Sequence, residues 1–169
     1  MFELLFTFFL IVLSFLFLYI VWRINARKYI SSGTVASAYD AWTQDKLIER
    51  LWGEHIHLGF YPLGKKNVDF RKAKEQFVHE LVKWSGLDKL PKGSRILDVG
   101  CGIGGSSRIL AEYYGFNVTG ITISPAQVKR ARELTPQGLN CNFQVMDALD
   151  LKFEDGSFDA AGVLRLAHT

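Results

Sequence analysis

Cysteine is scarce in this chain, and repeated or compositionally biased tracts are missing. The sequence has two cysteines in 169 residues, Cys101 and Cys141. Two such isolated residues form neither a disulfide framework nor the spacing of a metal site, so we expect a reducing compartment. The missing tracts exclude a repeat architecture and a low-complexity protein.

A strong charge excess is also lacking. Twenty Lys and Arg residues face seventeen Asp and Glu residues, which gives a formal net charge of +3. A nucleic-acid-binding protein would concentrate its basic residues on one face, so this balance argues against a nucleic-acid partner. The nearest basic cluster consists of Lys65, Lys66, Arg71, Lys72 and Lys74. We interpret it as a solvated helix face; attraction to anionic lipid is the alternative.

Charge is missing altogether from residues 4–22, which read LLFTFFLIVLSFLFLYIVW. As a helix this run would be roughly 28 Å long, close to the ~30 Å of a bilayer core. A secretory signal would be shorter and preceded by basic residues, whereas here Arg23, Arg27 and Lys28 follow the run and Glu3 precedes it. We therefore predict a single-pass transmembrane anchor over 1–22, with the rest of the chain on the cytoplasmic side. A buried core helix is the alternative.

The next segments predict a linker and a helical region. Residues 23–35 include a small polar stretch, and we interpret them as the linker. Hydrophobic spacing predicts one helix over 36–52 and another over 68–85, separated by the loop 54–64. The helical region as a whole spans 36–90.

Residues 91–169 change to alternating strands and helices. Apolar runs predict strands at the following segments: 95–99, 117–121, 142–146 and the start of a fourth at 157–163. Helices are expected between them at 106–114 and 124–134, and the second begins with the capping box Ser124–Gln127. This succession predicts an α/β domain with a parallel, doubly wound, Rossmann-like sheet.

The first predicted strand runs into the glycine loop DVGCGIGG, residues 98–105. Gly100, Gly102 and Gly105 also fit the dinucleotide fingerprint G-x-G-x-x-G, which alone is a weak signal. Asp98 argues against NAD, because its carboxylate would repel a pyrophosphate and attract the ammonium and sulfonium charges of S-adenosylmethionine (SAM). The next strand ends near Thr122 without the acidic residue that a NAD site uses on the ribose. A tight turn without a ligand is the remaining alternative.

Residues 98–105 resemble motif I of class I SAM-dependent methyltransferases. DALDLKFEDGSFD at 147–159 resembles the later segment that reaches the adenine ring, and GITISPAQ at 120–127 is similar to a subgroup acting on lipids and terpenoids. The resemblance implies SAM as the cofactor. The residues implied to bind it are Asp98, Gly100, Cys101, Gly102, Gly104, Thr122, Ile123, Gln127, Asp147 and Ala148.

The segment VASAYDAWTQDKLIERLWGEHIHLGFYP resembles the lid of the tocopherol and plastoquinone methyltransferase family. Within that family, the stretch from FVHELVKWSG to the glycine loop is most similar to the cyanobacterial-type 2-methyl-6-phytyl-1,4-benzoquinone methyltransferases. The resemblance implies that residues 36–90 form the lid and that Tyr39 reaches the cofactor. It also implies methyl transfer to a ring carbon of a prenylated benzoquinol, a substrate whose tail lies in the lipid bilayer.

His55 and His57 stand two residues apart in this lid. A metal site is one interpretation, but no further His, Cys or carboxylate cluster completes it, so we expect no metal. We favour a role in the lid or the substrate pocket, or local hydrogen bonding. No catalytic residue is identified.

The last residues depart from the family pattern. After Phe158-Asp159-Ala160 the family continues with a sequence such as VWSVEAGPHMP, whereas this chain reads AGVLRLAHT. Displacing the reading frame by one base makes the two compatible codon by codon, so we hypothesise a frameshift near Ala161. The expected product is a partial SAM-binding domain over 91–169 with an incomplete sheet and impaired activity. A membrane-bound SAM-binding remnant without activity and half of a NAD-dependent oxidoreductase are the alternatives.

Overall fold

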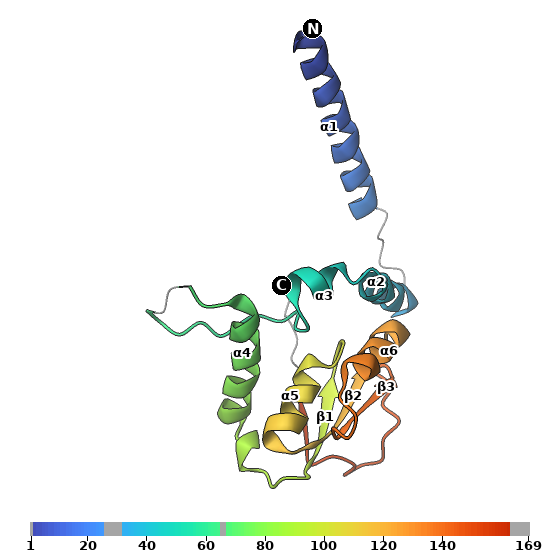
Figure 1. The fold of residues 1–169 in the computed structure, drawn as a ribbon. Coiled ribbons are helices and arrows are strands. Elements are labelled where there is room, and N and C mark those ends of the chain that lie inside the picture. Colours follow the sequence, from blue (N-terminus) through green and yellow to red (C-terminus); the bar gives the residue numbers. More distant parts are fainter. Residues whose placement is uncertain (1, 26–31, 65–66, 163–169) are drawn as a thin grey trace. The chain divides into compact units, whose positions relative to one another are not determined.

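The computed structural model describes residues 2–25, 32–64 and 67–162. The chain divides into two compact units, Met1–Val35 and Ala36–Thr169. Figure 1 shows one long helix in the first unit and a sheet with helices in the second.

Helix α1, Phe2–Asn25, forms where the uncharged run predicted a helix. Its described apolar side chains are solvent-exposed, with Phe15 69% exposed. Even so, over the residues that the structure describes, no helix is long and apolar enough to cross a membrane. The predicted helix is confirmed, whereas the prediction that it spans a membrane is not supported.

The predicted linker is shorter than expected. Residues 23–25 belong to α1 and residues 32–35 to α2, while 26–31 lie outside the described residues. The single helix expected over 36–52 is likewise two helices, α2 (Ser32–Gln44) and α3 (Leu47–Trp52). Lys46 separates them because its backbone is left-handed, with φ 54°, which a continuous helix does not allow. Asp45 stabilises the new start by accepting a 2.8 Å hydrogen bond from the Leu47 amide.

Helix α4, Phe70–Ser85, agrees with the predicted second helix and is followed by the short 3₁₀ helix η1, Leu87–Lys89. The basic residues around it do not form one solvated face, because Lys74 is only 4% exposed. Its ammonium donates to the carbonyls of His55, at 2.8 Å, and Trp52, at 3.1 Å. Lys65 and Lys66 lie outside the described residues.

The sheet contains four parallel strands in the order β3-β2-β1-β4. These are β1 (Arg95–Val99), β2 (Asn117–Thr122), β3 (Cys141–Val145) and β4 (Ala160–Gly162). The first three agree with the predicted strands to within one residue at each end. The fourth pairs with β1 over only three residues. Of the strand expected over 157–163, residues 157–159 form bends and irregular structure, and Val163 lies outside the described residues.

Helices α5 (Gly105–Tyr114) and α6 (Pro125–Leu134) connect β1 to β2 and β2 to β3 (Figure 1). Right-handed crossovers to neighbouring strands on the same side place both helices on one face of the sheet. Ile96, Val118 and Phe143 fill the core under them, each at most 2% exposed. The predicted parallel sheet is confirmed. Within the described ranges the crossover helices cover one face, so helices on both faces, as in a doubly wound sheet, are not seen there.

Candidate functional site

The carboxyl ends of β1, β2 and β3 meet at one edge of the sheet, where the sequence predicted the site. The amides of Gly100 and Cys101 both donate to the Ile121 carbonyl, at 2.8 and 3.0 Å. The Met146 amide donates to the Thr122 carbonyl at 3.0 Å, which continues this edge onto β3. The glycine loop, the segment after β2 and the segment after β3 therefore lie side by side.

The glycines of the loop differ in what surrounds them. Gly100 and Gly102 have φ of 76° and 56°, and a Cβ added to either would meet nothing within 4 Å. Gly104, at φ 84°, is packed instead, because its Cβ would lie 2.7 Å from the Phe143 ring. Only Gly100 and Gly102 combine the left-handed backbone that favours glycine with space for a ligand. A side chain at Gly104 would therefore clash with Phe143, while the cofactor contact expected of its backbone stays a prediction.

Asp98 lies beneath the loop and is 3% exposed. One carboxylate oxygen accepts a 2.6 Å hydrogen bond from the Ser107 hydroxyl on α5. Burial raises the pKa of Asp98 to about 6, while the Ser107 hydrogen bond opposes that shift. At neutral pH the site therefore holds a buried carboxylate bonded to a neutral hydroxyl, and no Lys, Arg or His among the described residues contributes to its pKa shift.

The side chain of Cys101 packs into the protein, so the cofactor contact predicted for this residue would come from its backbone. The residue is 8% exposed, and its sulfur lies 2.9 Å from the position of a Cβ added to Gly120. Burial raises the pKa of the thiol well above its ordinary value. A buried, neutral thiol of this kind is a packing group rather than a nucleophile.

Thr122, Ser124 and Gln127 form a hydrogen-bonded corner between β2 and α6. The Thr122 hydroxyl accepts from the Ser124 amide at 3.4 Å and donates to the Gln127 side-chain oxygen at 2.7 Å. The Ser124 hydroxyl accepts from the Gln127 amide at 3.1 Å, which confirms it as the N-cap of α6. The capping box is only half made, since the Gln127 side chain turns to Thr122 and leaves its NH₂ group as the donor for a ligand.

Ile123, which follows Thr122, is partly exposed. After β3, Asp147 is partly exposed and Ala148 is exposed. One Asp147 carboxylate oxygen accepts from the Leu149 amide at 2.9 Å, an Asx turn that shapes this segment. These residues lie at the ends of β2 and β3, and their contacts with the cofactor stay a prediction.

The lid, residues 36–90, contacts the sheet domain through three carboxylates. On α2, Asp40 accepts from the Ser124 hydroxyl at 2.5 Å and from the Ala126 amide at 3.0 Å. On α3, Glu49 binds the Arg130 guanidinium of α6 at 2.6 and 2.8 Å.

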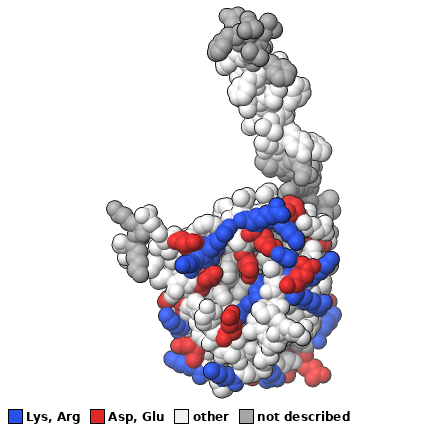
Figure 2. Space-filling model, in the orientation of Figure 1, with Lys and Arg blue, Asp and Glu red and all other residues white. Residues whose placement is uncertain are grey.

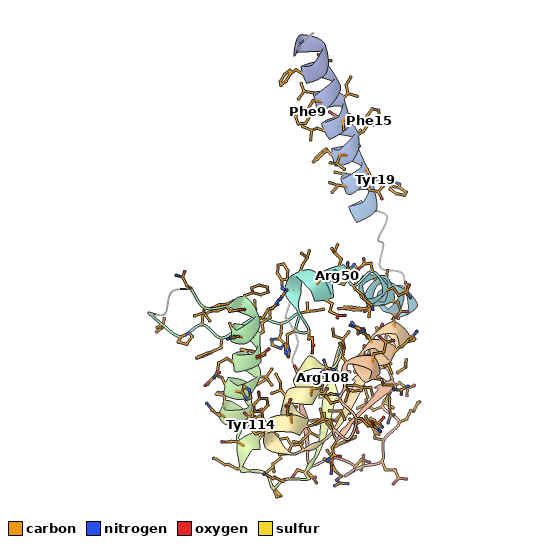
Figure 3. All side chains as sticks on the ribbon, in the orientation of Figure 1. Phe9, Phe15, Tyr19, Arg50, Arg108 and Tyr114 are labelled. Carbon is orange, nitrogen blue, oxygen red and sulfur yellow. The ribbon has the colours of Figure 1, made fainter. Side chains whose placement is uncertain are left out.

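The third lid carboxylate, Glu54, forms an ion pair of 2.5 Å with Arg108 of α5, labelled in Figure 3. Arg108 is 8% exposed and also donates to the Ile103 carbonyl of the glycine loop at 2.9 Å. Tyr39, the lid residue expected to reach the cofactor, is 37% exposed and packs edge-to-face on Trp42, with ring centroids 5.5 Å apart.

His55 and His57 contact each other. Nε2 of His57 lies 3.1 Å from Nδ1 of His55, and Nδ1 of His57 lies 2.8 Å from the Leu58 carbonyl. Because a carbonyl only accepts, His57 carries its proton on Nδ1 and accepts from His55. Burial lowers the pKa of His55 to about 3 and also lowers the pKa of His57. Within the described part of the chain, no cluster of three His, Cys, Asp or Glu side chains could hold a metal ion.

Surface charge shows no dominant sign. Figure 2 shows Lys and Arg interspersed with Asp and Glu over the face in view.

Three site residues, Asp40, Ser107 and Arg108, were not predicted from the sequence. Asp40 and Arg108 act through partners 84 and 54 residues away, which no local spacing reveals. Ser107 bonds Asp98 only nine residues away, within the same strand-loop-helix unit.

A family model described as a methyltransferase domain matches residues 96–169. The 2-methyl-6-phytyl-1,4-hydroquinone methyltransferase of Synechocystis sp. is 59% identical over 139 residues, which are 82% of this chain and 44% of that protein. The chloroplastic tocopherol O-methyltransferase of Arabidopsis thaliana is 42% identical over 67% of this chain and 35% of that protein.

Among solved structures, the [4+2]-cyclase SpnF has a TM-score of 0.66 and 30% sequence identity, covering 78% of this chain and 48% of that one. The chain thus spans less than half the length of these relatives. The glycine loop and the corner after β2 lie within residues 96–169, which the family model matches. The chain therefore belongs to the SAM-dependent methyltransferases, in the branch that includes the phytylhydroquinone and tocopherol methyltransferases.

Proposed function

We propose that this chain supplies the SAM-binding part and the lid of an enzyme that methylates a prenylated hydroquinone. The 59% identity to the Synechocystis phytylhydroquinone methyltransferase is the observation that carries this proposal. The site at the carboxyl edge of the sheet supports it, because its residues suit SAM better than a dinucleotide.

The buried Asp98 carboxylate is the main reason. A buried charge needs an opposite charge or several donors, and Asp98 has a hydroxyl donor alone among the described residues. The ammonium and sulfonium groups of SAM would compensate it, whereas a pyrophosphate would add repulsion. The open space at Gly100 and Gly102 admits the ligand close to the backbone.

The hydroxyl and amide groups of the corner suit a neutral sugar. The NH₂ group of Gln127 is free to donate to a ribose hydroxyl, and Thr122 holds that side chain in place. Asp147 and Ala148 would border the base at the neighbouring strand end. In this arrangement the chain's own residues bind and orient the cofactor and need not activate it.

SAM supplies a methyl group that its sulfonium already activates. The protein must then align the acceptor with that methyl and exclude water. The lid suits the second task, since its three carboxylates fasten it to α5 and α6. The acceptor would be a ring carbon made nucleophilic by loss of a proton from the neighbouring hydroxyl.

Calorimetric titration of the 169-residue chain with SAM and with NAD tests the cofactor assignment. We expect binding of SAM and none of NAD; binding of NAD without SAM would refute the proposal.

Transfer of a radiolabelled methyl group to 2-methyl-6-phytylhydroquinone tests the reaction. SAM binding without transfer would identify this chain as a cofactor-binding module alone.

We also propose that α1 holds the protein at a lipid bilayer. Most of its described side chains are apolar and exposed, and a prenyl tail would confine the acceptor to the same phase. A shared surface raises the effective concentration of the substrate. The basic residues after α1 favour the cytoplasmic side for the sheet domain. Protease added outside sealed cells tests this orientation, because a cytoplasmic sheet domain would be protected from cleavage.

A further inference from the structure

Asp40, on α2, forms hydrogen bonds with the N-terminal end of a different helix, α6. The N-cap of α6 is Ser124, yet the hydroxyl of this residue donates to Asp40 on α2, 84 residues earlier in the chain. The same oxygen, Oδ1, accepts from the Ala126 amide in the first turn of α6. Asp40 therefore supplies a second cap to α6 from the lid, where its negative charge also faces the positive end of the helix dipole.

The hydrogen bonds continue from Asp40 into the cofactor site. The Ser124 hydroxyl donates to Asp40 and accepts from the Gln127 amide, which fixes the first turn of α6. The Gln127 side chain in turn accepts from Thr122 at the end of β2. Ser124 and Gln127 are 0% and 6% exposed, so water competes little for these bonds.

The other two lid carboxylates do not reach this corner. Glu49 binds the Arg130 guanidinium, in the second turn of α6, and Glu54 binds the Arg108 guanidinium on α5. Asp40 also follows Tyr39, the lid residue expected at the cofactor. A displacement of Asp40 would thus move the corner residues and Tyr39 together.

We propose that Asp40 is a positioning residue that couples closure of the lid to SAM binding. By capping α6 from α2, it orients Gln127 for the ribose and holds the lid over the site. The inference rests on the proposed SAM site and adds to it a residue that does not itself touch the cofactor.

Calorimetric titration of the full chain with SAM tests this coupling. Asp40→Ala is expected to weaken SAM binding about tenfold, the scale of a lost cap. Asp40→Asn keeps the accepting oxygen and should bind within about threefold of the unmodified chain. Asp45→Ala is the matched control, because Asp45 caps α3 in the same lid without reaching α6; we expect unchanged affinity.

A second variant addresses the case in which Asp40→Ala does not fold, as circular dichroism would show. Ser124→Ala removes the hydroxyl between Asp40 and Gln127, and it should weaken SAM binding in the same way. In the double variant with Asp40→Ala, the loss should be smaller than the product of the two single losses.

Equal SAM affinity for the unmodified chain, Asp40→Ala and Ser124→Ala would overturn the coupling while leaving the proposed function intact. An equal loss in Asp40→Asn and Asp40→Ala, with no recovery from the retained acceptor, would also overturn it. Failure of the unmodified chain to bind SAM would instead refute the proposed function, and the coupling with it.

Discussion

At the scale of single residues, the buried charge of Asp98 lowers the stability of the fold but favours binding of SAM. Its carboxylate is buried beneath the glycine loop, and its pKa is raised from 3.8 to about 6. The folded state therefore prefers the protonated acid, and the stability this gives is fully present below pH 3.8 and lost as pH rises through 6. The same charge is the one that would attract SAM.

We predict that Asp98→Asn stabilises the fold at pH 7.5 and weakens SAM binding. Asparagine keeps an acceptor for Ser107 and removes the buried charge. The two-unit pKa shift sets an upper limit of about 3 kcal/mol on the gain, which should vanish near pH 4. Urea unfolding of both proteins between pH 4 and 7.5 measures it; a stability difference independent of pH would contradict the prediction.

The glycine loop was predictable from the sequence because strand, loop and helix start are local and each leaves its own signal. Gly100 and Gly102 lie where the spacing placed them. Gly104 and the Cys101 side chain also pack against Phe143 and Gly120, which the spacing did not predict. Spacing identifies which residues form a loop, but which side of the loop each one faces depends on distant partners.

At the scale of elements, the regular βα units were easier to predict than the lid. Strands β1 to β3 and helices α5 and α6 follow strong apolar patterns bounded by glycine or by a capping residue. The lid helix over 36–52 was predicted without its break, because Lys46 has no intrinsic preference for the left-handed conformation it adopts. We attribute the left-handed conformation of Lys46 to the contacts of α2 and α3 with the sheet domain. The local sequence does not encode these contacts.

The packing between the lid and α5 gives a second prediction. A Cβ at Gly105 would lie 2.7 Å from the His55 ring and 3.0 Å from the Glu54 carbonyl. Gly105→Ala should therefore push the lid loop away from α5, at a cost of about 1–3 kcal/mol, against a gain of about 1 kcal/mol in helix propensity.

Limited trypsin digestion would detect this displacement as faster cleavage within residues 45–58. Gly138→Ala is the matched control, because a Cβ there meets nothing within 4 Å among the described residues. Cleavage of the lid at equal rates in both variants would show that the loop absorbs the methyl group without moving.

At the scale of the whole molecule, the first unit differs from the second in what it exposes. α1 presents apolar side chains over its described length, whereas the sheet domain buries its apolar residues under α5 and α6. Binding to a bilayer through α1 and binding through the basic residues near α4 have opposite salt dependences. The first is hydrophobic and persists at high salt, and the second is screened within ~10 Å at 0.1 M.

We predict that the full chain floats with neutral phosphatidylcholine vesicles and still does so in 1 M salt. Leu10→Lys together with Leu13→Lys should abolish flotation, because each charge near the centre of an inserted helix costs ~2.5–3.5 kcal/mol and two lower the partition at least about a thousandfold. Leu63→Lys with Leu149→Lys adds the same charges at exposed leucines of the second unit and should leave flotation unchanged. Loss of flotation in 1 M salt, or equal loss in both double variants, would show that α1 is not the membrane contact.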